Sequence, residues 1–127
     1  MADTQKADTQ KLVFMVLHGP DHPEHATIPF VMGCAALASD VGVVLGFQAE
    51  GVELVRAGVA DGIHAAGFPP LAKLLADLQE LGGSLLVCGP CLNSRGIAAT
   101  ELIEGVEVVA AGRFVAEITS ATNSLVY

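Results

Sequence analysis

Several kinds of residue are scarce in this chain of 127 residues, and each scarcity excludes a class of protein. There is no tryptophan, only 16% of the residues are charged, and the net charge is −8. The six Lys and Arg are scattered, whereas binding to a nucleic-acid backbone requires a basic patch. An acidic surface is also repelled by anionic lipid headgroups. We therefore expect no nucleic-acid partner and no membrane attachment.

The sequence contains no long hydrophobic run, and we expect no secretory signal. The first apolar stretch covers residues 12–17, whereas a membrane-spanning helix needs roughly 20 apolar residues. Residues 1–11 read MADTQKADTQK, a polar tandem repeat without the apolar segment of a signal peptide. We expect a flexible tail over residues 1–11 and a cytoplasmic protein. In a reducing compartment the three cysteines are expected to be thiols.

Apolar residues, by contrast, make up 52% of the chain. The length suits one domain, which we place at residues 12–127, and a domain of this size buries enough surface to fold without disulfides or metals. A high apolar fraction with few charges also indicates that part of the surface is buried in a homo-oligomer.

Buried strands and helical patterns alternate along the sequence. The run at 12–17 is apolar without alternation, which is typical of a parallel strand covered on both faces, and further strands are expected at 41–47, 84–87 and 106–110. The clearest helix, residues 71–81, carries leucines at helical spacing between a Pro-Pro and a Gly-Gly pair. Further elements are expected as helices at 23–39, 52–57 and 112–121, a helical stretch at 91–103 with a break at Gly96, and a strand at 125–127. This order predicts an α/β fold with a mostly parallel sheet and helices on both faces.

Two cysteines directly follow the third expected strand, in the stretch LLVCGPCLNSRGI at residues 85–97. The working crevice of a parallel sheet lies at the carboxyl ends of its strands, where Cys88 is placed. Cys91 would lie in the first turn of the next helix, whose free N–H groups favour the thiolate. Arg95 could reach back toward the sulfur as a cation. The pattern predicts a reactive thiol site; the alternatives are inert packed thiols and half of a metal site, for which no second C-x-x-C is present.

Histidines cluster after the first expected strand, in HGPDHPEH at residues 18–25. His18 would share the sheet edge with Cys88 and, if the first and third strands are neighbours, could orient or deprotonate its thiol. Otherwise it is a loop histidine that caps its own turn. His18, His22 and His25 could also ligate a first-row metal, but two prolines favour an exposed turn. We predict neither a metal nor a cofactor.

Two further features receive structural interpretations. Cys34 has small apolar neighbours at helical spacing and is expected in the packed core. Residues 49–68 lack a clear pattern, and an insert of this kind commonly forms a lip of the site or an oligomer contact.

The cysteine stretch resembles motifs of two known families. Its tetrapeptide CGPC is the active-site motif of thioredoxins, but only these four residues match, and the preceding Trp and the later proline of thioredoxins are missing. A broader resemblance combines LLVCGPCLNSRGI with the opening strand and loop VFMVLHGP. Together they resemble the DsrE/DsrF/TusD-like family of small sulfur-relay proteins. In that family an apolar strand ends in a cysteine and an Arg-Gly-Ile follows, as Arg95-Gly96-Ile97 follows Cys88 here.

The second resemblance covers residues 12–127 and implies a three-layer α/β/α sandwich, flavodoxin-like or Rossmann-like, with a five-stranded parallel sheet. It implies that Cys88 carries sulfane sulfur as a persulfide in a cytoplasmic trimer or hexamer, between sulfur donor and acceptor proteins. Cys91 stands where the best-known relay members have no thiol, so it would be a second or resolving thiol. Two alternatives stay open: a dithiol–disulfide redox protein using the same pair, and a non-enzymatic oligomeric binding module.

Overall fold

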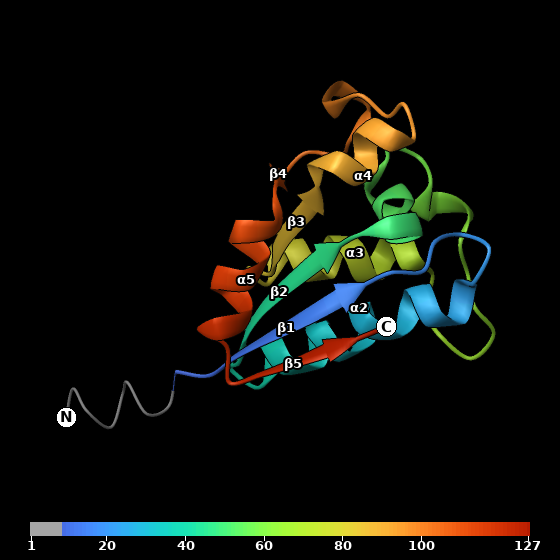
Figure 1. Cartoon of the computed structure of the whole chain (residues 1–127). Coiled ribbons are helices and arrows are strands. Elements are labelled where there is room, and N and C mark those ends of the chain that lie inside the picture. Colours follow the sequence, from blue (N-terminus) through green and yellow to red (C-terminus); the bar gives the residue numbers. More distant parts are fainter. Residues whose placement is uncertain (1–8) are drawn as a thin grey trace.

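The computed structural model describes residues 9–127, which form one parallel sheet with helices on both faces (Figure 1). The strands are β1 (Lys11–Val16), β2 (Gly42–Phe47), β3 (Ser84–Cys88), β4 (Val106–Val109) and β5 (Asn123–Val126). The α-helices are α2 (Pro23–Ala38), α3 (Leu71–Glu80), α4 (Gly89–Ser94) and α5 (Ala111–Thr119). Three short 3₁₀ helices complete the fold: η1 (Ala49–Val55), η2 (Ala60–Gly62) and η3 (Ala99–Glu101).

The strands lie in the order β4-β3-β2-β1-β5, and every neighbouring pair is parallel. Helices α2 and α3 cover one face and α5 covers the other, so the molecule has three layers (Figure 1). The expected α/β sandwich with a five-stranded parallel sheet is therefore confirmed. Because all five strands run the same way, their carboxyl ends meet at one edge, and η1 and α4 begin there.

The expected flexible tail lies mostly outside the described residues, since residues 1–8 are not among them. Its last residue, Lys11, already belongs to β1, where it pairs with Gly42. The Lys11 ammonium also contacts the Glu117 carboxylate of α5 at 2.8 Å. The sheet therefore begins one residue before the expected domain boundary.

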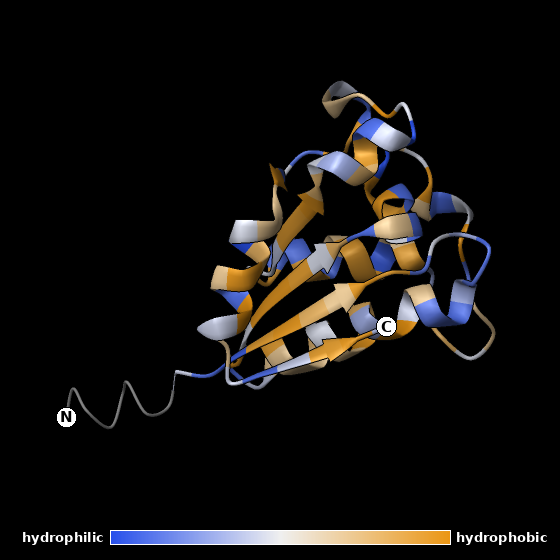
Figure 2. Ribbon diagram, viewed as in Figure 1, coloured by the Kyte–Doolittle hydropathy of each residue, from blue (hydrophilic) through white to orange (hydrophobic). Residues whose placement is uncertain are grey.

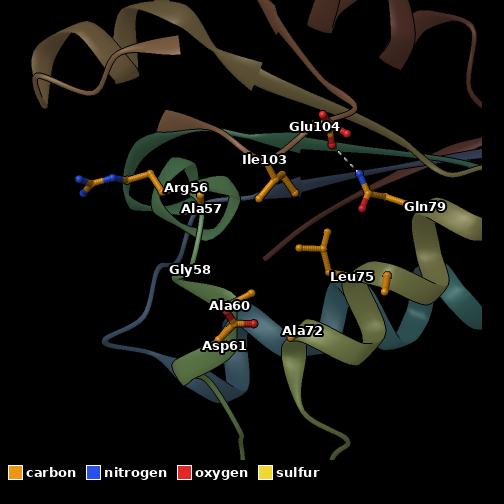
Figure 3. A pocket seen from close by; sticks show the side chains of 11 residues that line it. Arg56, Ala57, Gly58, Ala60, Asp61, Ala72, Leu75, Gln79, Ile103 and Glu104 are labelled. Carbon is orange, nitrogen blue, oxygen red and sulfur yellow. Dashed lines mark hydrogen bonds between the residues drawn. The ribbon is translucent and has the colours of Figure 1, made fainter. Parts of the chain in front are cut away.

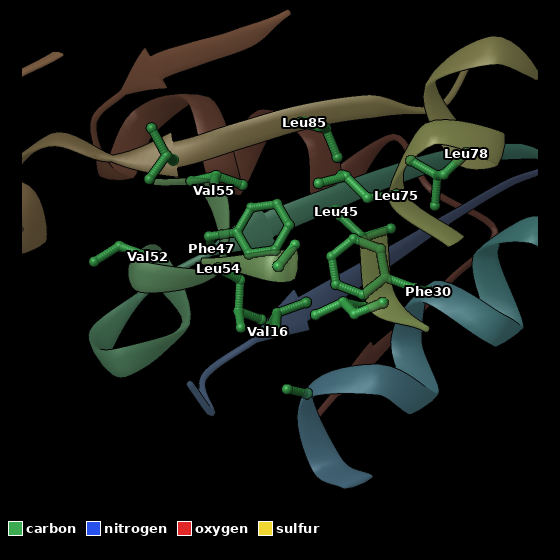
Figure 4. Close-up of a cluster of buried hydrophobic side chains, with 14 of the residues drawn as sticks. Val16, Phe30, Leu45, Phe47, Val52, Leu54, Val55, Leu75, Leu78 and Leu85 are labelled. Carbon is green, nitrogen blue, oxygen red and sulfur yellow. The ribbon is translucent and has the colours of Figure 1, made fainter. Parts of the chain in front are cut away.

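The larger hydrophobic core fills the space between the sheet and the layer of α2, α3 and η1 (Figure 4). Phe30 of α2 and Phe47 of β2 are fully buried there, with ring centroids 5.9 Å apart. The leucine stripe of α3 is confirmed, because four of its members are buried on this side: Leu71, Leu74, Leu75 and Leu78. Leu81 is the exception, since it is the C-cap residue and is 50% exposed.

A smaller core lies on the opposite face, under α5. Phe114, the buried residue of this helix, packs against four strand side chains: Val13, Met15, Val44 and Leu86. Gly46 of β2 makes room for the ring, because a Cβ at that position would lie 2.7 Å from Phe114 Cε1. Hydropathy follows the layers, with apolar strands in the middle and polar residues on the outer loops (Figure 2). None of the described helices is long and apolar enough to span a membrane.

Two helical segments differ in part from the sequence-based expectation. In the stretch at 91–103 the expected break at Gly96 is confirmed, because α4 ends at Ser94 and Gly96 takes a left-handed backbone, φ +67°. After the break the chain is irregular and then forms the short η3 instead of continuing as an α-helix. The N–H groups of Gly96 and Ile97 then donate to the carbonyls of Asn93 and Leu92, which is a Schellman motif. The helix expected over 52–57 is the 3₁₀ helix η1, which begins three residues earlier, at Ala49.

Candidate functional site

Cys88 occupies the junction between β3 and α4 at the carboxyl edge of the sheet. It is the last residue of the strand and the N-cap of the helix, with an extended backbone. Its Sγ accepts a hydrogen bond from the backbone N–H of Cys91 at 3.3 Å. The sulfur thus takes the place that a Ser or Asp oxygen usually fills at a helix start.

Cys91 lies one turn further on and contacts a different part of the chain. Its Sγ accepts a hydrogen bond from the backbone N–H of Ala49, the first residue of η1, at 3.4 Å. Cys88 and Cys91 are both half-buried free thiols. Each sulfur therefore has one backbone N–H donor and a partly open side.

The electrostatics of Cys88 differ from the sequence-based expectation. The pKa of the Cys88 thiol is raised, first by burial and second by the hydrogen bond with the Cys91 side chain. The Cys91 backbone N–H and the charge of Arg95 lower that pKa by less. A helix of six residues and one exposed guanidinium do not outweigh the desolvation of a half-buried sulfur. Burial therefore favours the protonated form of the Cys88 thiol.

Arg95 is close to the cysteines, but its hydrogen bonds go to other atoms than their sulfurs. Its guanidinium is exposed, and Nη1 donates to the carbonyl of Cys91 at 3.2 Å and to Ser94 Oγ at 3.3 Å. The expected reach toward the sulfur is thus a contact with the main chain of α4. The remaining influence of Arg95 on Cys88 is through space.

His18 lies at the same edge of the sheet but not beside the cysteines. The strand order places β2 between β1 and β3, so the condition for a contact between His18 and Cys88 is not met. Two strand spacings amount to about 10 Å. The His18 ring instead lies 5.0 Å from that of His22 and 4.8 Å from that of His25, measured between centroids. Its Nδ1 is buried without a hydrogen-bond partner among the described residues.

Two further candidates from the sequence are a metal site and Cys34. Over residues 9–127, no three His, Cys, Asp or Glu side chains are arranged to hold a metal ion. Cys34 lies between α2 and α3, where its Sγ donates to the Leu74 carbonyl at 3.5 Å. It is half-buried rather than fully packed, and it borders a pocket of about 270 Å³ with Asp77. Burial, followed by the charge of Asp77, raises the pKa of the Cys34 thiol.

A larger pocket of about 420 Å³ opens between η1, η2 and α3, away from the cysteines (Figure 3). Its floor is apolar, with Leu75 and Ile103, and its rim is charged, with Arg56, Asp61 and Glu104. Arg56 is already paired with Glu53 and Glu101. The Gln79 side chain closes one end by donating to the Glu104 carbonyl at 2.8 Å.

Sequence reasoning missed Ala49 as part of the cysteine site. Ala49 has φ +51°, a left-handed backbone that costs a non-glycine residue about 1–2 kcal/mol. Ala49 and Asp40 are the two non-glycine residues with positive φ among the described residues. No sequence signal marks an alanine for this conformation. Residues 49–68, whose role was open between a lip and an oligomer contact, contribute to the site through this first residue of η1.

Comparisons with known proteins bear on the family and the fold. The sequence profile described as DsrE/DsrF-like family matches residues 10–127. Two archaeal proteins of Methanocaldococcus jannaschii, both named as uncharacterized, are similar in sequence. MJ0760 is 29% identical over 96 residues, which is 76% of this chain and 35% of the relative, so the chain spans about a third of that protein. MJ0989 is 28% identical over 85 residues, covering 61% of this chain and 75% of the relative.

Solved structures show the same fold. The crystal structure of the ychN protein from E. coli superposes with a TM-score of 0.78 at 21% identity, covering 94% of this chain and all of the other. MTH1491 of Methanobacterium thermoautotrophicum, a protein of unknown function, gives a TM-score of 0.68 at 18% identity with 94% and 100% coverage. At these identities the similarity concerns the fold.

Proposed function

The chain belongs to the DsrE/DsrF-like family, and on that premise we propose that it is a sulfur-relay protein that carries sulfane sulfur as a persulfide on Cys88. Cys91 is the second, resolving thiol. The observation that carries the proposal is the cysteine pair itself. Cys88 and Cys91 are half-buried free thiols one helical turn apart, and the Cys91 backbone N–H donates a hydrogen bond to Cys88 Sγ. They lie at the carboxyl edge of a parallel sheet, where such folds hold their reactive groups.

Loading transfers one sulfur atom to Cys88. The Cys88 thiolate attacks the terminal sulfur of a donor persulfide, R–S–SH. A bond forms between Cys88 Sγ and that sulfur, and the donor leaves as the thiolate R–S⁻. The raised pKa of Cys88 makes this step faster at higher pH, because the thiolate is the nucleophile.

Unloading has two routes. A thiolate of an acceptor protein takes the terminal sulfur from Cys88 and regenerates the Cys88 thiolate. Alternatively, the Cys91 thiolate attacks Cys88 Sγ, which forms the Cys88–Cys91 disulfide and releases the terminal sulfur with its electron pair as HS⁻. An external dithiol then reduces the disulfide and becomes oxidised itself. The first route conserves sulfane sulfur, and the second delivers sulfide.

The test is the intact mass of the reduced protein after incubation with polysulfide, with Cys88→Ser and Cys91→Ser in parallel and Cys34→Ser as the matched control. We expect a stable gain of one sulfur atom, reversed by reductant, in Cys91→Ser. The wild type and Cys34→Ser should gain the same sulfur and then release it as HS⁻ while the Cys88–Cys91 disulfide forms, which leaves a net loss of two hydrogens. Cys88→Ser should gain none. Retention of that gain in Cys88→Ser would overturn the assignment of Cys88 as the carrier.

The hydrogen-bonded pair also favours a second candidate, a dithiol–disulfide redox protein. In that case the wild type loses two hydrogens on mild oxidation, and neither it nor Cys91→Ser gains sulfur from polysulfide. Neither Cys88→Ser nor Cys91→Ser could then form the disulfide within the chain. The same mass measurement separates the two functions.

We propose that the protein works as a cytoplasmic homo-oligomer, a trimer or hexamer, between sulfur donor and acceptor proteins. Exposed apolar side chains on α5 and β5 support this: Val115 is 58%, Ile118 37% and Val126 66% exposed in the single chain. Three free thiols suit a reducing compartment. Light scattering coupled to gel filtration tests the assembly, and a monomer at micromolar concentration would contradict it.

A further inference from the structure

The start of η1 has a backbone conformation that its own residue type does not explain. Of the two non-glycine residues with positive φ in the described chain, Asp40 has a short polar side chain of the kind that tolerates this region in turns. Ala49, at φ +51°, has no such side chain. Strained backbone at a site that the surrounding structure enforces points to a functional constraint.

Contacts from two other elements hold Ala49 in place. On one side, the Gln48 N–H donates to the carbonyl of Val16, at the end of β1, at 3.1 Å. The neighbouring Glu50 packs against the loop after β1, where a Cβ on Gly19 would lie 2.6 Å from the Glu50 carbonyl oxygen. On the other side, the Ala49 N–H meets Cys91 Sγ at 3.4 Å. The strained residue therefore connects β1 to the second thiol.

The direction of this bond bears on the chemistry of the pair. A hydrogen bond donated to sulfur favours the thiolate over the thiol. The Cys91 N–H donates to Cys88, whereas the donor to Cys91 comes from another segment and is fixed in space by it. The donor to Cys91 is thus held by contacts outside the C-x-x-C stretch, which fixes its position relative to the sulfur.

We propose that Ala49 is a positioning residue whose backbone N–H stabilises the Cys91 thiolate and thereby selects Cys91 as the attacking group that releases sulfide. The inference rests on the proposed function for its last clause and deepens it. In the step concerned, the Cys91 Sγ–Cys88 Sγ bond forms, the bond to the terminal sulfur breaks, and HS⁻ leaves with the electron pair. The amide donor acts before this step, by populating the nucleophile.

The experiment replaces the Ala49 amide by an ester, with lactic acid at position 49 introduced by nonsense suppression. The substitution removes one N–H and keeps the methyl group. It is made in a Cys34→Ser, Cys88→Ser protein, in which Cys91 is the remaining thiol. Iodoacetamide alkylation of Cys91 is followed against pH. We expect the midpoint to rise by about one pH unit, which is a tenfold loss of thiolate below the midpoint.

Two controls separate the donor from a general structural effect. Ala49→Gly keeps the N–H and tolerates positive φ, so its midpoint should equal that of the parent. The ester in a Cys34→Ser, Cys91→Ser protein should leave the alkylation profile of Cys88 unchanged. Thermal unfolding confirms that each variant is folded at the temperature of the assay. Equal Cys91 midpoints for the ester and amide proteins would overturn the inference.

A second readout concerns sulfur chemistry in the chain with both thiols. Sulfide release from protein loaded with polysulfide should be about tenfold slower in the ester variant at pH 7, with loading of Cys88 unchanged. If no variant takes up sulfur, the proposed function fails while the alkylation result still decides the role of Ala49. If loading occurs and sulfide release is equal in both proteins, the selection of Cys91 as attacking group is wrong.

Discussion

Gly51 of η1 lies directly against the backbone carbonyl of Val16, the last residue of β1, with no room for a side chain between them. Closeness of this kind requires glycine, because a Cβ would overlap the carbonyl oxygen. The contact sets the path of η1 as it leaves the sheet, two residues after Ala49. It therefore links the packing of the core to the position of the N–H that meets Cys91.

Gly51→Ala should move η1 and destabilise the protein. Relief of the overlap with a backbone atom requires a shift of the main chain, and overpacking of this kind costs about 1–3 kcal/mol. Urea denaturation measures the free energy of unfolding. Gly62→Ala is the matched control, since a Cβ on this 3₁₀-helix glycine meets nothing within 4 Å. We expect the control to stay within about 0.5 kcal/mol of the wild type; equal losses in both would refute the role of the Val16 contact.

Gly46 and Phe114 should show energetic coupling across the second core. Gly46→Ala places a Cβ 2.7 Å from the Phe114 ring and 2.9 Å from Met15 Sδ. Phe114→Leu frees the space under α5, so the double variant should be less destabilised than the sum of the single variants by about 1 kcal/mol. Gly42→Ala, in the same strand, is the control, because a Cβ at this position has its nearest neighbour at 3.4 Å. Its effect on the free energy of unfolding should add to that of Phe114→Leu without coupling. Additivity for Gly46 as well would contradict the packing described for α5.

Glu117 should contribute to the pH dependence of stability. Hydrogen bonds from Lys11 and then Arg113 hold the pKa of the Glu117 carboxyl below its ordinary value. A lowered pKa stabilises the folded state above the unfolded pKa of about 4.3, and this contribution is lost as the pH falls through the folded pKa. Glu117→Gln should therefore cost about 0.5–1 kcal/mol at pH 7 and much less at pH 3.

Urea denaturation at both pH values checks this expectation. Glu80→Gln is the matched control, because Glu80 forms no ion pair among the described residues. A Glu117→Gln loss that is the same at pH 3 and pH 7 would assign the effect to packing rather than to charge.

Much of the fold was readable from the sequence because buried parallel strands and a leucine stripe leave strong patterns. The end of α4 was also predicted, since Gly96, where a break was expected, is the left-handed residue that closes the helix in a Schellman motif. The site was only half readable. Motif and position identify Cys88 and Cys91, but the donor to Cys91 is a main-chain group on Ala49, and main-chain groups have no sequence signature.

The separation of His18 from the cysteines illustrates a second limit. Hydrophobic pattern predicts that strands exist, whereas the order of the strands follows from the packing of the whole chain. The sequence placed His18 and Cys88 at one edge, as the structure does, but β2 lies between their strands. A contact between side chains on two strands is thus a prediction about topology as much as about residue type.

The pH dependence of alkylation at Cys88 tests the electrostatics of the site. Because burial and then the Cys91 side chain raise the pKa of the Cys88 thiol, its midpoint with iodoacetamide should lie above the ordinary cysteine value of about 8.5. Cys91→Ala removes the second cause and keeps the backbone N–H donor, so the midpoint should fall part of the way back. Arg95→Ala removes the smallest contribution, a lowering one, and should raise the midpoint slightly. Peptide mapping by mass spectrometry assigns each alkylated cysteine.

The ordering of these three midpoints carries the argument. Arg95→Ala above wild type and Cys91→Ala below it would show that the neighbouring thiol, more than the guanidinium, controls Cys88. A large rise of the Cys88 midpoint in Arg95→Ala would instead indicate a direct interaction of the guanidinium with the Cys88 sulfur. That result would conflict with the hydrogen bonds of Arg95 to the Cys91 carbonyl and Ser94. An unchanged midpoint in Cys91→Ala would leave burial as the whole cause and would decouple the two thiols on which the resolving step depends.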